Sequence, residues 1–172
     1  MTMERFEVLP LHQNKHLIKQ CFALIHSEWP ARNEKAPIME SLEESCDTMP
    51  ISLILVKKEE DNSETLIGHA QISLIPDIPN GSFIKTVVIL NHYRGKGLGK
   101  YLLLKTEEYI KTLGLHFAYL CTISIEEFYS KLGYIQCQPV FFCGGSLSGT
   151  KESKIVPVGG TSFKTFMKKQ LT

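Results

Sequence analysis

The sequence has no long hydrophobic run. No uninterrupted apolar stretch approaches the roughly 20 residues that a membrane-spanning helix needs. The first ten residues, MTMERFEVLP, also lack the apolar segment of a secretory signal peptide. These absences argue against a helical membrane protein and against export, so we expect a cytoplasmic protein.

Paired cysteines and an excess of charge are missing as well. The five cysteines are an odd number and none forms a C-x-x-C pair, so we expect reduced thiols, no disulfide framework and no metal site. The 19 basic and 18 acidic residues give a net charge of +1. General nucleic-acid binders normally carry a basic surplus. We therefore expect neither a nucleic acid nor a membrane as a partner.

Two common phosphate-binding motifs are absent. No Gly lies five residues before a Gly-Lys-[Ser/Thr] triplet, and Lys100 holds the third glycine position of G-x-G-x-x-G. The sequence has instead YRGKGLGKYL, residues 93–102, between a β-branched segment and an apolar helical pattern. Glycines there let an anion approach the unpaired N–H groups of a helix start. The stretch predicts a phosphate cradle; the alternative is a solvated loop that merely begins the helix.

The whole chain, residues 1–172, suits a single domain, being 43% hydrophobic and 22% charged. Apolar periodicity and turn residues predict an α/β fold. We expect helices from 14 to about 30, between 37 and 50, from 98 to 113 and over 124–132. The expected strands cover residues 5–11, 51–57, 65–75, 82–90, 116–123, 134–142 and 161–169.

The segment RGKGLG resembles the R/Q-x-x-G-x-G/A motif of the GCN5-related N-acetyltransferases (GNAT), with Arg94, Gly97 and Gly99 at the defining positions. The order of expected elements is similar to that family's order along nearly the whole chain. The resemblance implies a central, mostly antiparallel seven-stranded sheet, splayed at the cofactor site and flanked by about four helices. It also implies that acetyl-CoA is the acetyl donor.

The resemblance further assigns the residues that would hold acetyl-CoA. The loop would bind the pyrophosphate through its N–H groups, and the end of the preceding strand would bind the pantetheine arm. The expected cofactor residues are Val87, Val88, Ile89, Arg94, Gly95, Lys96, Gly97, Leu98, Gly99, Lys100, Thr122 and Tyr129.

A second motif, FYSKLGY, places Tyr129, Gly133 and Tyr134 at the family's Tyr-x-x-x-Gly-[Phe/Tyr] positions. The resemblance implies that Tyr129 protonates the departing thiolate; the alternative is that it only packs against the sheet. A phenol with a pKa of about 10 suits this task. His69, acting through a water, and Tyr119 are candidate bases, although a lone strand histidine is more often structural.

Direct attack by the acceptor amine is the expected route, since no obvious base accompanies Cys121 to make it a nucleophile. The lack of a strong base favours an α-amine, with a pKa of about 7.7–8, over a lysine side chain at about 10.4.

Within the family, EWPAR and GHAQIS are similar to the branch of N-terminal acetyltransferases that acts on actin. That resemblance implies acidic, Asp- or Glu-starting N-termini as substrates, with actin, alone or bound to profilin, as the partner of a monomeric enzyme. Trp29, Arg32 and Lys35 would line one wall of the acceptor groove. Lys151 and Lys154 would lie on the other wall, or are ordinary surface lysines. The alternatives are a small-molecule amine acetyltransferase on the same fold and an inactive acetyl-CoA-binding module.

Overall fold

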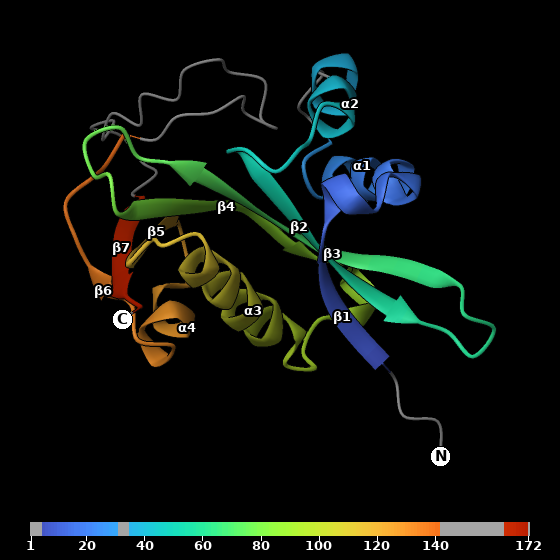
Figure 1. The fold of residues 1–172 in the computed structure, drawn as a ribbon. Coiled ribbons are helices and arrows are strands. Elements are labelled where there is room, and N and C mark those ends of the chain that lie inside the picture. Colours follow the sequence, from blue (N-terminus) through green and yellow to red (C-terminus); the bar gives the residue numbers. More distant parts are fainter. Residues whose placement is uncertain (1–4, 31–34, 142–163, 172) are drawn as a thin grey trace.

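The computed structural model describes residues 5–30, 35–141 and 164–171, with the backbone alone for 35–37. Figure 1 shows a central sheet with helices on both faces. The strands are β1 (Arg5–Pro10), β2 (Ile51–Lys58), β3 (Glu64–Leu74), β4 (Gly81–Ile89), β5 (Phe117–Thr122), β6 (Ile135–Gln136) and β7 (Thr165–Gln170). The helices are α1 (Ile18–Glu28), α2 (Lys35–Glu43), α3 (Leu98–Thr112) and α4 (Glu126–Lys131), with short 3-10 turns at Leu11–Gln13, Lys15–Leu17 and Asn91–Tyr93.

The seven strands follow the order β1-β2-β3-β4-β5-β7-β6. Every neighbouring pair is antiparallel except β4 with β5, which run parallel. Helices α1 and α2 cover one face, while α3 and α4 lie on the other (Figure 1). This arrangement confirms the fold class predicted from the sequence.

Strand alternation explains how one sheet supports two cores. Successive strand residues point to opposite faces, and Ala70 and Ile72 of β3 pack in the cluster that contains the α3 leucines. Their neighbours His69, Gln71 and Ser73 are therefore directed to the face of α1 and α2, where they are buried. Both faces of the sheet are packed with hydrophobic side chains, and these three polar side chains of β3 are buried on the α1 face.

Several predicted elements differ in extent, and helix α1, predicted from residue 14, begins at Ile18 after a 3-10 turn. Helix α2 begins before Pro37, which a first helical turn tolerates because its N–H groups are unpaired anyway, and it ends at Glu43. The predicted strand 134–142 is reduced to Ile135–Gln136; Pro139, which has no N–H, interrupts further pairing. Strand β7 begins at Thr165, whereas residues 161–163 and 142 of the predicted strands lie outside the described residues.

A buried charged network attaches α3 to the far half of the sheet. Glu107 of α3 is 5% exposed, and its carboxylate accepts hydrogen bonds from the Tyr134 hydroxyl at 3.0 Å and the Lys169 ammonium at 2.7 Å. Burial and the Glu107 carboxylate raise the pKa of Tyr134, so the phenol stays protonated. Helix α3 is therefore fixed to β7 by charge-assisted bonds as well as by apolar packing.

Among the helices within the described residues, none combines the length and the apolar character needed to cross a membrane.

Candidate functional site

The site begins where β4 and β5 separate. The two strands pair only over Gly81–Phe83 of β4 and Phe117–Tyr119 of β5. Beyond Phe83, β4 continues for six residues to Ile89 without a partner in β5. This part of β4, which carries Val87, Val88 and Ile89, therefore has main-chain groups directed at a gap in the sheet.

The glycine loop lies at the open end of that gap. Gly95 and Gly97 have φ angles of 76° and 79°, and Gly97 is the residue before α3. No side chain caps the helix, and a Cβ built on either glycine would have no atom within 4 Å. Uncapped N–H groups beneath open space are what an anion requires. The residues therefore fit a pyrophosphate.

The side chains of this loop contribute less than its backbone. Leu98 is 8% exposed and packs into the core, so only its main chain can reach a ligand. Lys96 and Lys100 are exposed, and the Lys96 ammonium lies 5.4 Å from the centre of the Tyr93 ring. Both lysines are near enough in sequence to add positive charge around the cradle.

Arg94 is engaged elsewhere in the protein. Its Nε donates to the Ile89 carbonyl at 2.8 Å, and its Nη2 donates to Glu28 at 2.6 Å. The guanidinium thus connects the loop to the end of β4 and to the last residue of α1. No local sequence signal points to Glu28, because the contact joins residues that are far apart in the chain. These two contacts hold the loop against β4 and α1, and the predicted contact of Arg94 with the cofactor stays a prediction.

Helix α4 brings Tyr129 to the same place. A Cβ added to Gly99 would lie 3.8 Å from Phe128 Cζ, so α4 lies beside the start of α3. Tyr129 is 7% exposed and makes edge contacts with the rings of Phe128 and Tyr134. Burial, with a smaller contribution from Cys121, raises the pKa of Tyr129 to about 12. The phenol is therefore protonated throughout the physiological range, as a proton donor must be.

Cys121 and Thr122 are the last two residues of β5, directly before the turn into α4. The Thr122 hydroxyl accepts a hydrogen bond from the Ile125 N–H at 3.2 Å and so holds the turn that begins α4. Burial raises the pKa of the Cys121 thiol, which disfavours the thiolate that a nucleophile would need. The surroundings of Cys121 are thus consistent with direct attack by the amine.

His69 lies on the α1 side of β3, fully enclosed, with an exposed fraction of 0%. Its Nδ1 lies 2.7 Å from the Thr86 carbonyl oxygen and its Nε2 lies 3.1 Å from the Ser52 hydroxyl. Burial lowers the pKa of His69 to about 4. Both ring nitrogens are occupied, so the geometry favours a role other than that of a base.

Of the predicted acceptor wall, the structure describes Trp29 and the backbone of Lys35. Trp29 directly follows α1 and packs, half-buried, against the core beneath α1 and α2. Lys35 begins α2, but only its backbone is described. Arg32, Lys151 and Lys154 lie outside the described residues.

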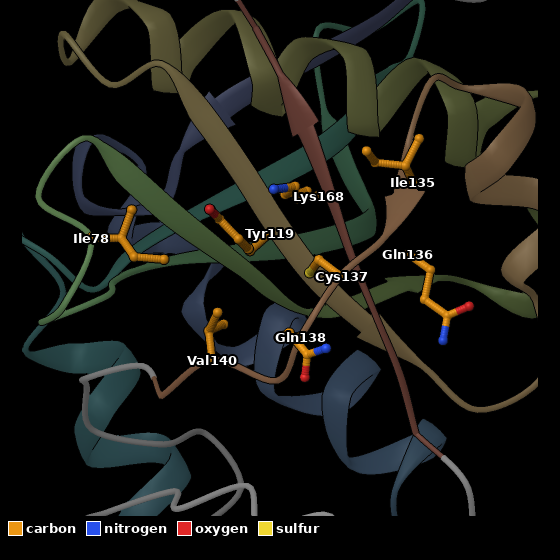
Figure 2. A pocket seen from close by; sticks show the side chains of 8 residues that line it. All are labelled: Ile78, Tyr119, Ile135, Gln136, Cys137, Gln138, Val140 and Lys168. Carbon is orange, nitrogen blue, oxygen red and sulfur yellow. The ribbon is translucent and has the colours of Figure 1, made fainter.

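A cavity of about 730 Å³ lies on the same face as α1, at the end of the sheet formed by β5, β7 and β6 (Figure 2). Tyr119 and Lys168, which are opposite each other in the β5–β7 register, both line it. Within the described residues, Lys168 has no carboxylate within salt-bridge distance. The cavity begins beside the last paired position of β4 and β5, and Lys168 places a basic group there.

Lys85 is a further basic group that the sequence did not single out. It lies in the part of β4 that has no partner in β5, and strand alternation places it on the face opposite its neighbour Ile84, which packs on the α3 side. Burial lowers the pKa of Lys85 to about 8, so a sizeable fraction is neutral near physiological pH.

Comparisons with known proteins agree with this geometry. Residues 16–134 match the acetyltransferase (GNAT) family. N-alpha-acetyltransferase 80 of Mus musculus is 31% identical over 126 residues, which cover 72% of this chain and 40% of that protein. The chain thus aligns with less than half of the length of this curated relative.

Solved structures show the same fold at low sequence identity. A GNAT acetyltransferase from Staphylococcus aureus Mu50 superposes with a TM-score of 0.65 at 16% identity, over 98% of this chain and 100% of that one. An aminoglycoside 6'-N-acetyltransferase in complex with coenzyme A gives a TM-score of 0.66 at 18% identity, over 96% of this chain and 97% of that one.

Proposed function

The chain belongs to the GNAT acetyltransferase family, and we propose that it transfers the acetyl group of acetyl-CoA to the free α-amine of acidic protein N-termini. The observation that carries the donor half of this proposal is the uncapped, glycine-lined start of α3 at the mouth of the β4–β5 gap. The acceptor half is supported by the identity with N-alpha-acetyltransferase 80 and by the basic groups on the α1 face.

Acetyl-CoA, when bound, supplies an acetyl group activated as a thioester. The N–H groups of Leu98, Gly99 and Lys100 would hold its pyrophosphate, and the backbone of Val87–Ile89 would hold the pantetheine arm. Thr122 would contribute by shaping the turn into α4 beside that arm. These assignments use main-chain groups, so they depend on backbone conformation more than on side-chain identity.

In the proposed reaction the neutral α-amine attacks the acetyl carbonyl carbon directly and the carbon–sulfur bond breaks. Tyr129 donates its phenolic proton to the departing sulfur and recovers one from solvent. The nitrogen gives up a proton, for which Lys85 is a candidate acceptor because it lies in the part of β4 that has no partner in β5 and burial lowers its pKa to about 8. An α-amine with a pKa of about 7.7–8 needs little further activation.

Replacing Tyr129 with phenylalanine is expected to lower kcat by about 10²-fold, because the variant lacks the proton donor. The affinity for CoA should change little, since the ring contacts with Phe128 and Tyr134 remain. Steady-state CoA release between pH 6.5 and 9 measures both quantities. Tyr109→Phe on α3, away from the gap, is the matched control. Wild-type turnover of Tyr129→Phe at every pH would rule out the proton-donor role.

The acceptor is proposed to be processed actin, alone or in complex with profilin, or another protein that begins with Asp or Glu. Peptides that begin Asp-Asp or Glu-Glu are expected to release CoA at least ~10-fold faster than peptides that begin with neutral residues, because unlike charges attract across the acceptor face. The measurement is turnover across a panel of peptides that differ only in their first two residues.

Two further acceptors decide between the candidate functions. N-terminally blocked peptides with an internal lysine should be inert, and equal activity on them would contradict α-amine specificity. Polyamines or arylamines that outcompete the acidic peptides would instead favour the small-molecule acetyltransferase.

A further inference from the structure

Strand β4 contains a bulge immediately before its open end. In the β3–β4 register, Gln71 lies opposite Lys85 and His69 lies opposite Val88, so two steps along β3 correspond to three along β4. Thr86 takes up the extra residue with a φ of 52°. A β-branched residue rarely adopts this left-handed conformation, so the surrounding structure has to impose it.

The bulge determines the direction of the backbone that follows it. Thr86 lies beyond Phe83, the last residue of β4 that pairs with β5, and directly precedes Val87–Ile89. An extra residue in a strand shifts the alternation and bends the chain. The bulge therefore sets which N–H and C=O groups of Val87–Ile89 are directed into the gap.

His69 contacts the bulge at its strained residue. The Thr86 carbonyl can only accept a hydrogen bond, so the 2.7 Å contact requires the proton on His69 Nδ1. Nε2 is then the acceptor for the Ser52 hydroxyl at 3.1 Å. One imidazole thus connects β2, β3 and the bulge of β4, and its full burial leaves it a single orientation.

We propose that His69 is a positioning residue that holds Thr86 in its left-handed conformation, and so aligns the backbone of Val87–Ile89 for the acetyl donor. The inference deepens the proposed function and rests on it, since it takes that backbone as the part of the site that binds acetyl-CoA. His69 acts through Thr86 and touches neither the donor nor the acceptor. The role differs from that of a base, which would need a nitrogen directed at the acceptor.

The test is a double-mutant cycle. His69→Leu removes both hydrogen bonds. We expect His69→Leu to weaken CoA binding and to lower kcat/KM by at least ~30-fold, by analogy with misplacement of a substrate-holding group. In the Thr86→Gly background the same His69→Leu change should cost at most ~3-fold, since the restraint is no longer needed.

Asn62→Gly is the matched control for the glycine. Asn62 also has a positive φ, 66°, but it lies in the turn between β2 and β3, away from the bulge. The effect of His69→Leu should remain the same in the Asn62→Gly background. Where His69→Leu fails to fold, His69→Asn, which retains a donor near the position of Nδ1, provides the same cycle with smaller effects.

Calorimetric titration with CoA is read alongside turnover, so the inference can fail separately from the proposed function. A wild-type protein that binds CoA but acetylates no acidic peptide would overturn the acceptor assignment, while the CoA affinities still decide the role of His69. Equal losses of CoA affinity from His69→Leu in the wild-type and Thr86→Gly backgrounds would overturn the positioning role, as would an unimpaired His69→Leu single variant.

Discussion

Gly97→Ala is expected to weaken CoA binding by about 10²-fold, while Gly114→Ala leaves it within about twofold. The two glycines stand at opposite ends of α3, with φ angles of 79° and 78°, and a Cβ on either would meet no atom within 4 Å. The cost of placing a side chain at positive φ, about 1–2 kcal/mol, is therefore the same for both. At Gly97 the new methyl group would also reduce the room for a phosphate at the uncapped start of α3.

The expected difference in CoA affinity between Gly97→Ala and Gly114→Ala corresponds to the loss of one or two charge-assisted hydrogen bonds to a phosphate in Gly97→Ala, at about 1.5–3 kcal/mol each. Calorimetry with CoA gives the affinities, and urea unfolding shows whether the two variants lose equal stability. Similar CoA affinities for the two variants would show that the start of α3 is not the anion site.

The free energy of unfolding is expected to fall by up to about 3 kcal/mol between pH 7 and pH 4 because of His69 alone. Burial lowers the pKa of His69 from 6.5 to about 4 in the folded protein. Below pH 6.5 the unfolded chain takes up a proton that the folded protein does not, so stability decreases as the pH falls towards 4. The expected loss of free energy is the lowering of the pKa of His69 multiplied by about 1.4 kcal/mol per pKa unit.

Urea titrations at pH 7, 5.5 and 4.5 measure this dependence. His69→Asn should start from a lower stability at pH 7 and show a shallower decline, because asparagine does not titrate. His92→Asn, at an exposed position in the turn before the glycine loop, should keep the full decline. A decline of the same steepness in His69→Asn and wild type would mean that other groups cause it.

The elements of the site that could be predicted from the sequence are those with local signals. Glycine spacing located the start of α3 at Leu98, and a run of β-branched residues after a turn located β4. The acetyl-donor side of the site can therefore be predicted, because each of its elements is determined by a short local stretch of sequence.

The parts that could not be predicted depend on contacts between distant residues. Nothing in a threonine within a β-branched run indicates a left-handed bulge, because threonine is common in ordinary strands. The Arg94–Glu28 contact and the burial of His69 both arise only once α1 and β2 are packed on the sheet. The short length of β6 likewise depends on Pro139 and on its pairing with β7, which is distant in the sequence.

The limited pairing of β4 with β5 has a mechanical consequence. Three residue pairs join the half-sheet β1–β4 to the half-sheet β5–β7–β6, and a Cβ on Gly81 at this joint would lie 2.8 Å from Ile78 Cγ2. From Phe83 to Ile89, β4 extends as a lever roughly 20 Å long, at about 3.3 Å per residue. A rotation of about 3° at the joint therefore moves the tip of β4 by about 1 Å, a displacement large enough to change catalysis. Helix α3 packs on β3 and β4 and is bound to β7 through the Glu107–Lys169 contact. It therefore resists this rotation and limits changes in the width of the gap between β4 and β5.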